Sequence, residues 1–100
     1  MILRERYLKQ PSSGAVNWNT YSDLRGEIAQ ISVNPSSAST IYDFRITDDA
    51  GTTVYYKPGL QGIFVDDTKL GAFGIYTLGI ESASISNASW TTTLIWDENV

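Results

Sequence analysis

The chain contains no cysteine and no histidine in its 100 residues, and both absences narrow the chemistry available to it. Without cysteine there is no disulfide framework and no thiolate metal site. Without histidine the chain lacks the commonest general base, the commonest metal ligand and the usual pH switch of proteins. We therefore expect no metal centre and no bound cofactor.

Positive charge is also scarce, since 7 Lys and Arg against 11 Asp and Glu give a formal net charge of −4. Apart from Arg4, Arg6 and Lys9 the basic residues are scattered, so the basic footprint of a nucleic-acid-binding protein is missing. No apolar run approaches a membrane span, and charges interrupt the first residues where a signal peptide needs an apolar stretch. The sequence thus predicts a protein made without a secretory signal, with neither nucleic acid nor a membrane as partner.

A β-hairpin is the clearest local pattern, and it occupies residues 40–57. Three apolar side chains alternate with three polar ones over residues 42–47, which is the period of a strand buried on one face. Asp48 and Gly51 suit the first and fourth positions of a type I turn that closes a three-residue loop with a bulge. Residues 52–57 then return as the second strand.

The turn also predicts the register of this hairpin. Ile46 then pairs with Val54 and Phe44 with Tyr56 on the inner face, while Tyr55 lies on the outer face. A slip by one residue would pair apolar with polar positions, so this register is the expected one.

Further short strands are expected on both sides of the hairpin, at spacings typical of a sandwich or barrel. They cover residues 2–8, 25–33, 62–65, 75–80 and 90–96. The approach to Tyr76 is also similar to the tyrosine corner of Greek-key sandwiches. The sequence predicts a single all-β domain over residues 1–100, an antiparallel β-sandwich of jelly-roll or immunoglobulin-like type.

Neighbouring carboxylates at residues 48–49, 66–67 and 97–98 are the main candidates for chemistry. Two acids can hydrolyse a glycosidic bond, and carboxylate oxygens suit calcium. Adjacent acids at turns are more often turn formers, the spacing fits no calcium loop, and no serine has a histidine partner. We therefore predict that the chain is not an enzyme and that it has neither catalytic nor metal-binding residues.

Three aromatic residues are candidates for an interaction surface rather than for the core. Trp18 and Tyr21 lie in a polar stretch predicted as a loop, and Tyr55 is predicted on the outer face of the hairpin. Exposed aromatic rings on a sandwich can stack on sugars or anchor a protein interface. The alternative for Trp18 is a loop residue folded back over one end of the core.

The two terminal strands supply the remaining candidates, which are Ile2, Arg4, Arg6 and Ile95. Neither strand has one clean apolar face, because Ile95 alternates with Leu94 and Trp96. A neighbouring subunit or another protein surface would cover the second face. The alternative is that the two terminal strands pair with each other and bury both faces within one chain.

Residues 41–48, 59–66 and 73–78 resemble parts of small all-β virion proteins of tailed bacteriophages, some of which are capsid cement or decoration proteins. The resemblance covers the central half of the chain. It implies a structural protein of the virion, made in the host cytoplasm, that self-associates as a homo-oligomer and contacts the major capsid protein or another virion protein. It carries over no functional residue.

Two functions therefore remain as predictions. The first is a capsid cement or decoration protein that binds and stabilises a lattice of major capsid protein. The second is a carbohydrate- or receptor-binding β-sandwich module, used in a fibre or in host recognition. Both inferences are made at the level of the fold, which by itself does not determine function.

Overall fold

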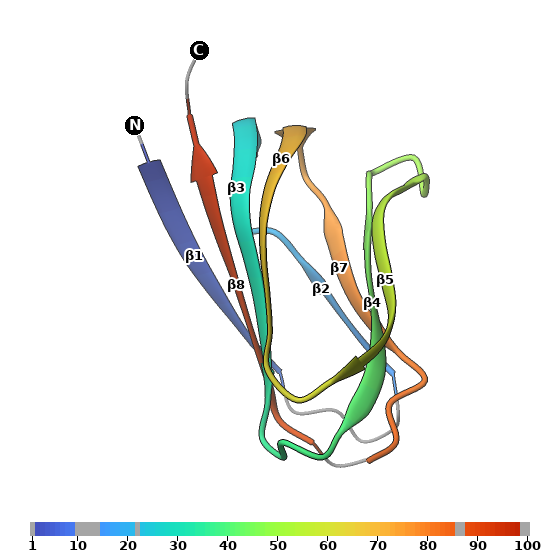
Figure 1. The fold of residues 1–100 in the computed structure, drawn as a ribbon. Coiled ribbons are helices and arrows are strands. Elements are labelled where there is room, and N and C mark those ends of the chain that lie inside the picture. Colours follow the sequence, from blue (N-terminus) through green and yellow to red (C-terminus); the bar gives the residue numbers. More distant parts are fainter. Residues whose placement is uncertain (1, 10–14, 22, 86–87, 99–100) are drawn as a thin grey trace.

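The computed structural model describes residues 2–9, 15–21, 23–85 and 88–98, and it consists of two antiparallel four-stranded sheets packed face to face (Figure 1). The strands are β1 (Ile2–Lys9), β2 (Val16–Asn19), β3 (Leu24–Pro35), β4 (Ile41–Thr47), β5 (Thr53–Gln61), β6 (Phe64–Gly74), β7 (Thr77–Glu81) and β8 (Trp90–Asp97). The predicted all-β sandwich is confirmed.

The strand order identifies the sandwich as a jelly roll rather than an immunoglobulin-like fold. One sheet has the order β1-β8-β3-β6 and the other the order β2-β7-β4-β5. The first strand therefore pairs with the last, the second with the seventh, the third with the sixth and the fourth with the fifth. This is the arrangement of a chain folded in half and rolled up, which is characteristic of an eight-stranded jelly roll.

The core lies between the sheets and is filled by alternate residues of the strands. The inward side chains of β8 are Trp90, Thr92, Leu94 and Trp96, all of them buried. The ring of Trp90 meets the ring of Tyr42 from the other sheet edge to face, with centroids 4.9 Å apart. This aromatic pair joins the two sheets near the ends where β4 and β8 begin, and such contacts add to the burial of apolar area.

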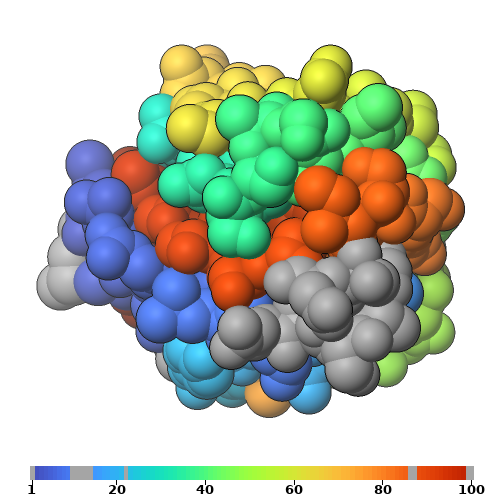
Figure 2. All heavy atoms as spheres, turned by 90° about the horizontal axis from the view of Figure 1, so that it is seen from below, coloured from blue at the N-terminus to red at the C-terminus, as the bar shows by residue number. Residues whose placement is uncertain are grey.

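One end of the core is covered by two connections that Figure 2 shows from below. The connection over residues 36–40 joins β3 to β4, and residues 82–85 follow β7. Ser36 donates its backbone N–H to Ser89, and Ser84 donates to Ile41, so both connections are bonded to strand ends. These bonds satisfy backbone groups that the sheets leave unpaired.

The turn of the central hairpin forms as the sequence predicts. Gly51 has φ +85°, and its N–H donates to the carbonyl of Asp48 at 3.0 Å. The Asp48 carboxylate also accepts the backbone N–H groups of Ala50 and Thr52. Thr47 pairs with Thr53, as expected.

Beyond that pair the predicted register is wrong, because the strands shift by one residue after Thr47. Ile46 pairs with Tyr55 instead of Val54, so Val54 is the extra residue of a β-bulge. Tyr55 consequently turns inward, and its ring packs edge to face on Phe44 with centroids 6.1 Å apart. Tyr56, predicted in the core, is instead 41% exposed.

A second irregularity lies in β3, which covers the strand predicted over residues 25–33. The pairings of β3 shift between Ile28 and Gln30 with both of its neighbours. Ile28 and Ile31 are therefore both buried, although they are three residues apart. The extra residue Ala29 absorbs the odd spacing.

The predicted boundaries of three strands, β5, β6 and β7, are wrong. β5 runs through Pro58, which was expected to end it, because β5 is an edge strand where a missing N–H is tolerated. β6 continues through Asp66 and Asp67 to Gly74 instead of ending at the acids. The predicted strand over 75–80 accordingly begins later, with β7 at Thr77. The Tyr76 hydroxyl accepts the backbone N–H of Phe73 at 2.7 Å and donates to the carbonyl of Phe73 at 3.2 Å, so it bonds the backbone upstream as in a tyrosine corner.

Candidate interaction surface

The outer face of the β1-β8-β3-β6 sheet brings together four of the seven predicted surface residues. Ile2, Arg4 and Arg6 alternate outward along β1, and Ile95 of β8 is paired directly with Arg4. The terminal strands do pair with each other, but they do not bury both faces, since Ile2 is 72% exposed. We call this surface the β1-sheet face.

Exposed apolar side chains on the β1-sheet face are concentrated on its two edge strands. Leu8 of β1 is 64% exposed, and Val65 and Phe73 of β6 are exposed on the opposite edge. Large exposed apolar side chains grouped on one face are typical of protein-binding surfaces. Val65 and Phe73 were not predicted as surface residues. The alternation of residues 63–73 carries this signal, but the strand predicted over residues 62–65 stops before the two adjacent acids.

Trp18 does not belong to any exposed surface, and its prediction as an interaction residue is wrong. It lies on β2, where Val16 and Trp18 point inward and alternate with two outward asparagines. Trp18 is only 5% exposed and is part of the core. The stretch predicted as a loop is a strand, so the side chain reaches the core by alternation and not by folding back.

Tyr21 and Tyr55 lie outside the β1-sheet face. Tyr21 is exposed, and its ring rests on that of Tyr7 with centroids 4.8 Å apart. Tyr55 points inward from β5, contrary to prediction, and its hydroxyl donates to the carboxylate of Asp66 at 2.5 Å. The structure therefore places these two tyrosines at opposite edges of the sandwich.

Each open edge of the sandwich has a tyrosine bonded to a carboxylate. At the β1 edge the Tyr7 hydroxyl donates to Glu5 at 2.6 Å, as Tyr55 does to Asp66 at the β6 edge. Burial raises the pKa of both phenols, and the neighbouring carboxylates raise it further. Both hydroxyls therefore stay protonated and act as hydrogen-bond donors that hold their acids in place.

The acids at residues 48–49 and 66–67 have separate surroundings within each pair. Asp48 is occupied by the hairpin turn, and Asp49 is exposed beside it. Asp66 and Asp67 are consecutive in β6, so their carboxylates point to opposite faces of the sheet. Asp66 accepts from Tyr55, while Asp67 accepts from Gln30 at 2.8 Å.

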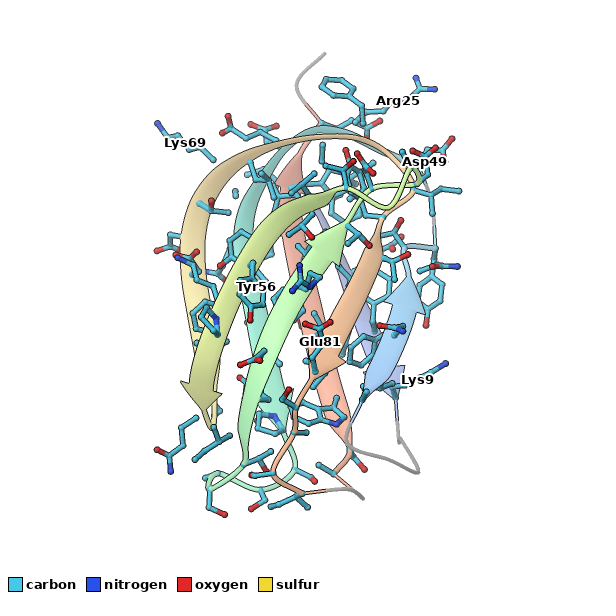
Figure 3. The ribbon with its side chains drawn as sticks, turned by 90° about the vertical axis from the view of Figure 1, so that its right-hand side faces the viewer. Lys9, Arg25, Asp49, Tyr56, Lys69 and Glu81 are labelled. Carbon is cyan, nitrogen blue, oxygen red and sulfur yellow. The ribbon has the colours of Figure 1, made fainter. Side chains whose placement is uncertain are left out.

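The outer face of the β2-β7-β4-β5 sheet, seen in Figure 3, is organised around Arg45. Its Nε donates to Glu81 at 3.1 Å, and its Nη1 donates to Thr53 at 2.7 Å. The guanidinium also lies 4.4 Å from the ring centroid of Tyr56. Gly79 is paired with Arg45 and is buried, and a Cβ there would come within 2.9 Å of the Asn17 side chain. We call this surface the Arg45 face.

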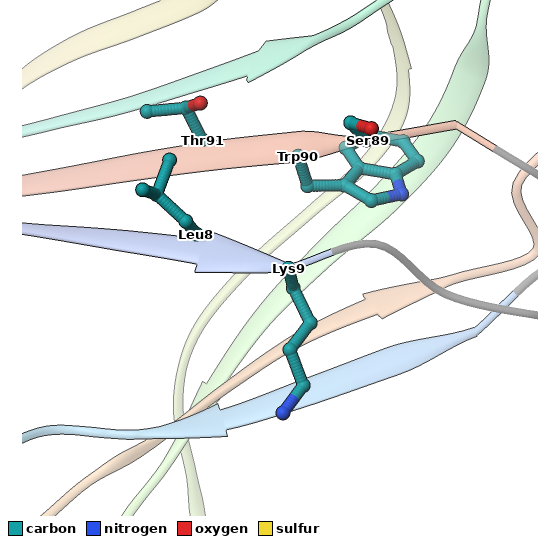
Figure 4. A pocket seen from close by; sticks show the side chains of 5 residues that line it. All are labelled: Leu8, Lys9, Ser89, Trp90 and Thr91. Atoms are coloured by element: carbon teal, nitrogen blue, oxygen red, sulfur yellow. The ribbon is translucent and has the colours of Figure 1, made fainter.

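Two shallow hollows open on the described surface. The first, of about 300 Å³, is lined by Leu8, Lys9, Ser89, Trp90 and Thr91 (Figure 4). The second, of about 270 Å³, is lined by Gly26, Glu27, Phe73 and Asp97 on the β1-sheet face. Within the part of the chain that the structure describes, no group of three or more acidic side chains could hold a metal ion.

The described ranges also contain no helix that is long and apolar enough to cross a membrane.

No family model matches the chain, and no curated protein matches it in sequence. Among solved structures, it is similar to PliG, a periplasmic inhibitor of g-type lysozyme from Aeromonas hydrophila. The identity is 10% over 95% of this chain and 84% of that chain, with a TM-score of 0.47. A chain of infectious bursal disease virus, Gx strain, is 14% identical over 95% of this chain and 31% of its own length, with a TM-score of 0.36. Neither similarity assigns a function.

Proposed function

We propose that the chain is a structural protein of a virion, a capsid cement or decoration protein that binds a lattice of major capsid protein through the β1-sheet face. In this proposal the protein is made in the host cytoplasm without a secretory signal. It works by binding and not by catalysis, and its partners are proteins rather than nucleic acid or membrane.

The observation that carries the proposal is the exposure of Ile2, Leu8 and Phe73 on one face. Ile2 and Leu8 flank Arg4 and Arg6 on β1, and Phe73 lies on the opposite edge strand. Fully burying one large apolar side chain contributes about 1.5–3 kcal/mol. A protein that covers such a face only in the assembled particle stabilises the assembly by mass action.

The jelly-roll topology also supports the proposal, because this fold is common in viral capsid domains. It is common in lectins too, so the topology favours both predicted functions over an immunoglobulin-like receptor module. The choice between the two depends on which outer face is used.

The test is whether the chain belongs to a particle. Virions from the native source are purified, and the chain is quantified against the major capsid protein. The chain is then stripped from the particles and added back, as the wild type, as Leu8→Asp, or as Thr77→Asp on the Arg45 face. We expect wild type and Thr77→Asp to restore the melting temperature of the particle and Leu8→Asp to fail. Absence of the chain from purified virions would overturn the proposal.

A carbohydrate-binding module is the second candidate, and the Arg45 face favours it. Tyr56 presents a partly exposed ring next to the polar side chains of Arg45 and Thr53. Aromatic rings flanked by hydrogen-bonding groups are the usual means of fixing a polar ligand with apolar faces, such as a sugar. A glycan array with wild type and Tyr56→Ala tests it, and binding that Tyr56→Ala does not weaken would reject this site.

A further inference from the structure

Strand β6 has one side that no other described strand pairs with. It is bonded to β3 on one side, and it ends the order β1-β8-β3-β6 on the other. The backbone N–H and C=O groups of a strand point alternately to its two sides, so an edge strand can accept a further strand. More and less exposed residues alternate without a break from Phe64 to Gly74, although β3 shifts its pairing opposite this strand. The free edge of β6 therefore keeps the period that a further strand needs.

The other edge strands are poorer acceptors. β5 contains Pro58, which cannot donate to a ladder, and β2 has only four residues. β1 carries two arginines on one face. The two longest antiparallel pairings of β1 with a second β1 place Arg4 opposite Arg6 or Arg6 opposite itself, and like charges directly opposite are destabilising. These comparisons favour β6 as the edge for a further strand.

A second copy of β6 fits this edge in one antiparallel register. Antiparallel strands that keep their inward residues on one side of the sheet pair positions of equal parity. With Thr68 opposite Thr68 of the second copy, Asp67 lies opposite Lys69 and Lys69 lies opposite Asp67. In the same register Ile63 lies opposite Phe73, and these side chains are 67% and 72% exposed. A two-fold axis between the two Thr68 residues, perpendicular to the sheet, makes each contact occur twice.

The neighbouring registers lose this agreement. A shift by one residue would turn the inward residues of one copy to the outer side. A shift by two residues places Asp67 opposite itself in one direction and Lys69 opposite itself in the other. Like charges directly opposite are destabilising, so charge complementarity selects the register centred on Thr68. Lys69 projects from this edge of the sandwich (Figure 3).

The next strand inward brings no like charges together on the outer side of the junction. Glu27 of β3 is paired with Gly71, which lies opposite the apolar Val65 of the second copy. Arg25 of β3 is paired with Phe73, which lies opposite an isoleucine. The charged residues of β3 are therefore each separated from the second copy by an uncharged residue of β6.

The inner side of the junction also has charges of both signs. Asp66 lies opposite Leu70 of the second copy in this register, and its carboxylate accepts the hydroxyl of Tyr55. Lys57 of β5 has its Nζ 5.7 Å from the ring centroid of Tyr55. Each copy thus brings one anion and one cation to this side, and the anion is already hydrogen-bonded.

We infer that the chain forms a homodimer in which β6 pairs antiparallel with β6 of a second copy, about a two-fold axis at Thr68. The two four-stranded sheets then join into one continuous sheet. Outward side chains of neighbouring strands stand side by side and stay accessible, so the dimer presents two β1-sheet faces on the same side. The contact uses the edge of the sheet and leaves open the face that the proposed function assigns to the capsid, so it does not depend on that function. Because one strand of each copy makes the contact, a weak dimer that depends on concentration is expected.

The first test is a charge exchange on the purified chain, followed by sedimentation velocity over a concentration series. Asp67→Lys alone places lysine opposite lysine at both contacts, and Lys69→Asp alone places aspartate opposite aspartate. Each should raise the dimer dissociation constant by about tenfold or more. A mixture of the two variants has opposite charges at both contacts of the heterodimer, so dimers should return on mixing. Lys9→Asp and Asp49→Lys are matched charge reversals away from β6 and should dimerise as the wild type does.

The second test locates the axis. The chain has no cysteine, so Thr68→Cys introduces one thiol per copy, and the two thiols lie opposite each other at the axis. Directly opposed residues of antiparallel strands have Cβ atoms about 4.5–5.5 Å apart, near the spacing of a disulfide. Diamide, which oxidises thiols to disulfides, should convert this variant into a covalent dimer. Thr52→Cys, in the exposed hairpin turn, should stay monomeric at the same concentration.

Recovery on mixing cannot arise from misfolding, because each variant is defective by itself. A wild type that is monomeric throughout the series, or single variants that do not recover on mixing, would overturn the inference. Thr68→Cys that cross-links no faster than Thr52→Cys would also overturn it, since the contact would lie elsewhere. A monomeric wild type that still binds virions overturns the dimer and leaves the proposed function in place. A dimer that behaves as expected, in a chain that is absent from virions, supports the inference and overturns only the proposed function.

Discussion

The two outer faces of the sandwich differ in how their charged side chains are placed. On the Arg45 face the charged group is satisfied within the sheet, since Arg45 contacts Glu81, Thr53 and Tyr56. On the β1-sheet face Arg4 and Asp67 lie on the two opposite edge strands of the sheet, and two strands separate them. Charges that are complementary across a face, but too far apart to meet within it, can be paired by a second molecule.

The exposed apolar side chains of the two outer faces differ as well. Ile2, Leu8 and Phe73 are each more than 60% exposed around the β1-sheet face, whereas Tyr56 of the Arg45 face has a cation next to its ring. The two sheets of one fold therefore differ in how far their outer side chains are satisfied within the sheet. Changes on the Arg45 face should alter stability, and changes on the β1-sheet face should alter association.

The largest expected effect is on the stability of the whole fold. Gly62→Ala should lower the free energy of unfolding by about 2–4 kcal/mol, because Gly62 has φ +65° and a Cβ would lie 2.7 Å from the carbonyl oxygen of Ala38. Urea denaturation measures the change. Gly51→Ala is the matched control, since Gly51 has φ +85° but no atom within 4 Å, and it should cost only about 1 kcal/mol. Equal effects would show that the close approach to Ala38 is absent.

Alkaline pH should lower the free energy of unfolding of the whole fold through its buried phenols. Burial raises the pKa of Tyr42 to about 12, so its hydroxyl stays protonated in the folded chain while the unfolded chain loses that proton from about pH 10. The unfolded state then binds fewer protons, and the free energy of unfolding falls as pH rises from about 10 to 12. Urea midpoints should show this loss, and Tyr42→Phe should show a smaller one. A midpoint of wild type that does not change over this range would contradict the burial of the phenol.

The smallest expected effect concerns the Arg45 face alone. Arg45→Ala removes an ion pair with Glu81 whose side chains are 33% and 44% exposed, together with the contact to Tyr56. Because exposed pairs contribute little, the expected loss of stability is about 1 kcal/mol. Thermal unfolding measures it, and binding of the variant to stripped virions should be unchanged. Weakened binding to virions would mean that the two faces are not independent.

The sequence was sufficient for the class of fold and for the turn of the central hairpin. Period-two alternation and the pair Asp48 and Gly51 are local signals, and local signals survive without knowledge of the partner strand. The bulges at Val54 and Ala29 were not predictable in the same way, because a bulge is defined by two residues facing one on another strand. One bulge was enough to exchange the positions of Tyr55 and Tyr56.

The candidate surface was predictable only in part, for the same reason. Alternation within β1 places Ile2, Arg4 and Arg6 on one face, and this was visible in the sequence. The contribution of Asp67 depends on three successive strand pairings that join residues far apart in the chain. Trp18 failed as a candidate because a four-residue strand among polar residues resembles a loop.

The central claim is that the β1-sheet face is completed by a partner and the Arg45 face is not. The most direct measurement is backbone amide hydrogen exchange of the chain, first free and then bound to stripped virions. We expect slower exchange on binding at Arg4, Ile95, Gln30 and Asp67. We expect no change at Asn17, Arg45, Tyr56 and Thr77. Exchange that the particle leaves unchanged, or that it slows on the Arg45 face instead, would contradict the account.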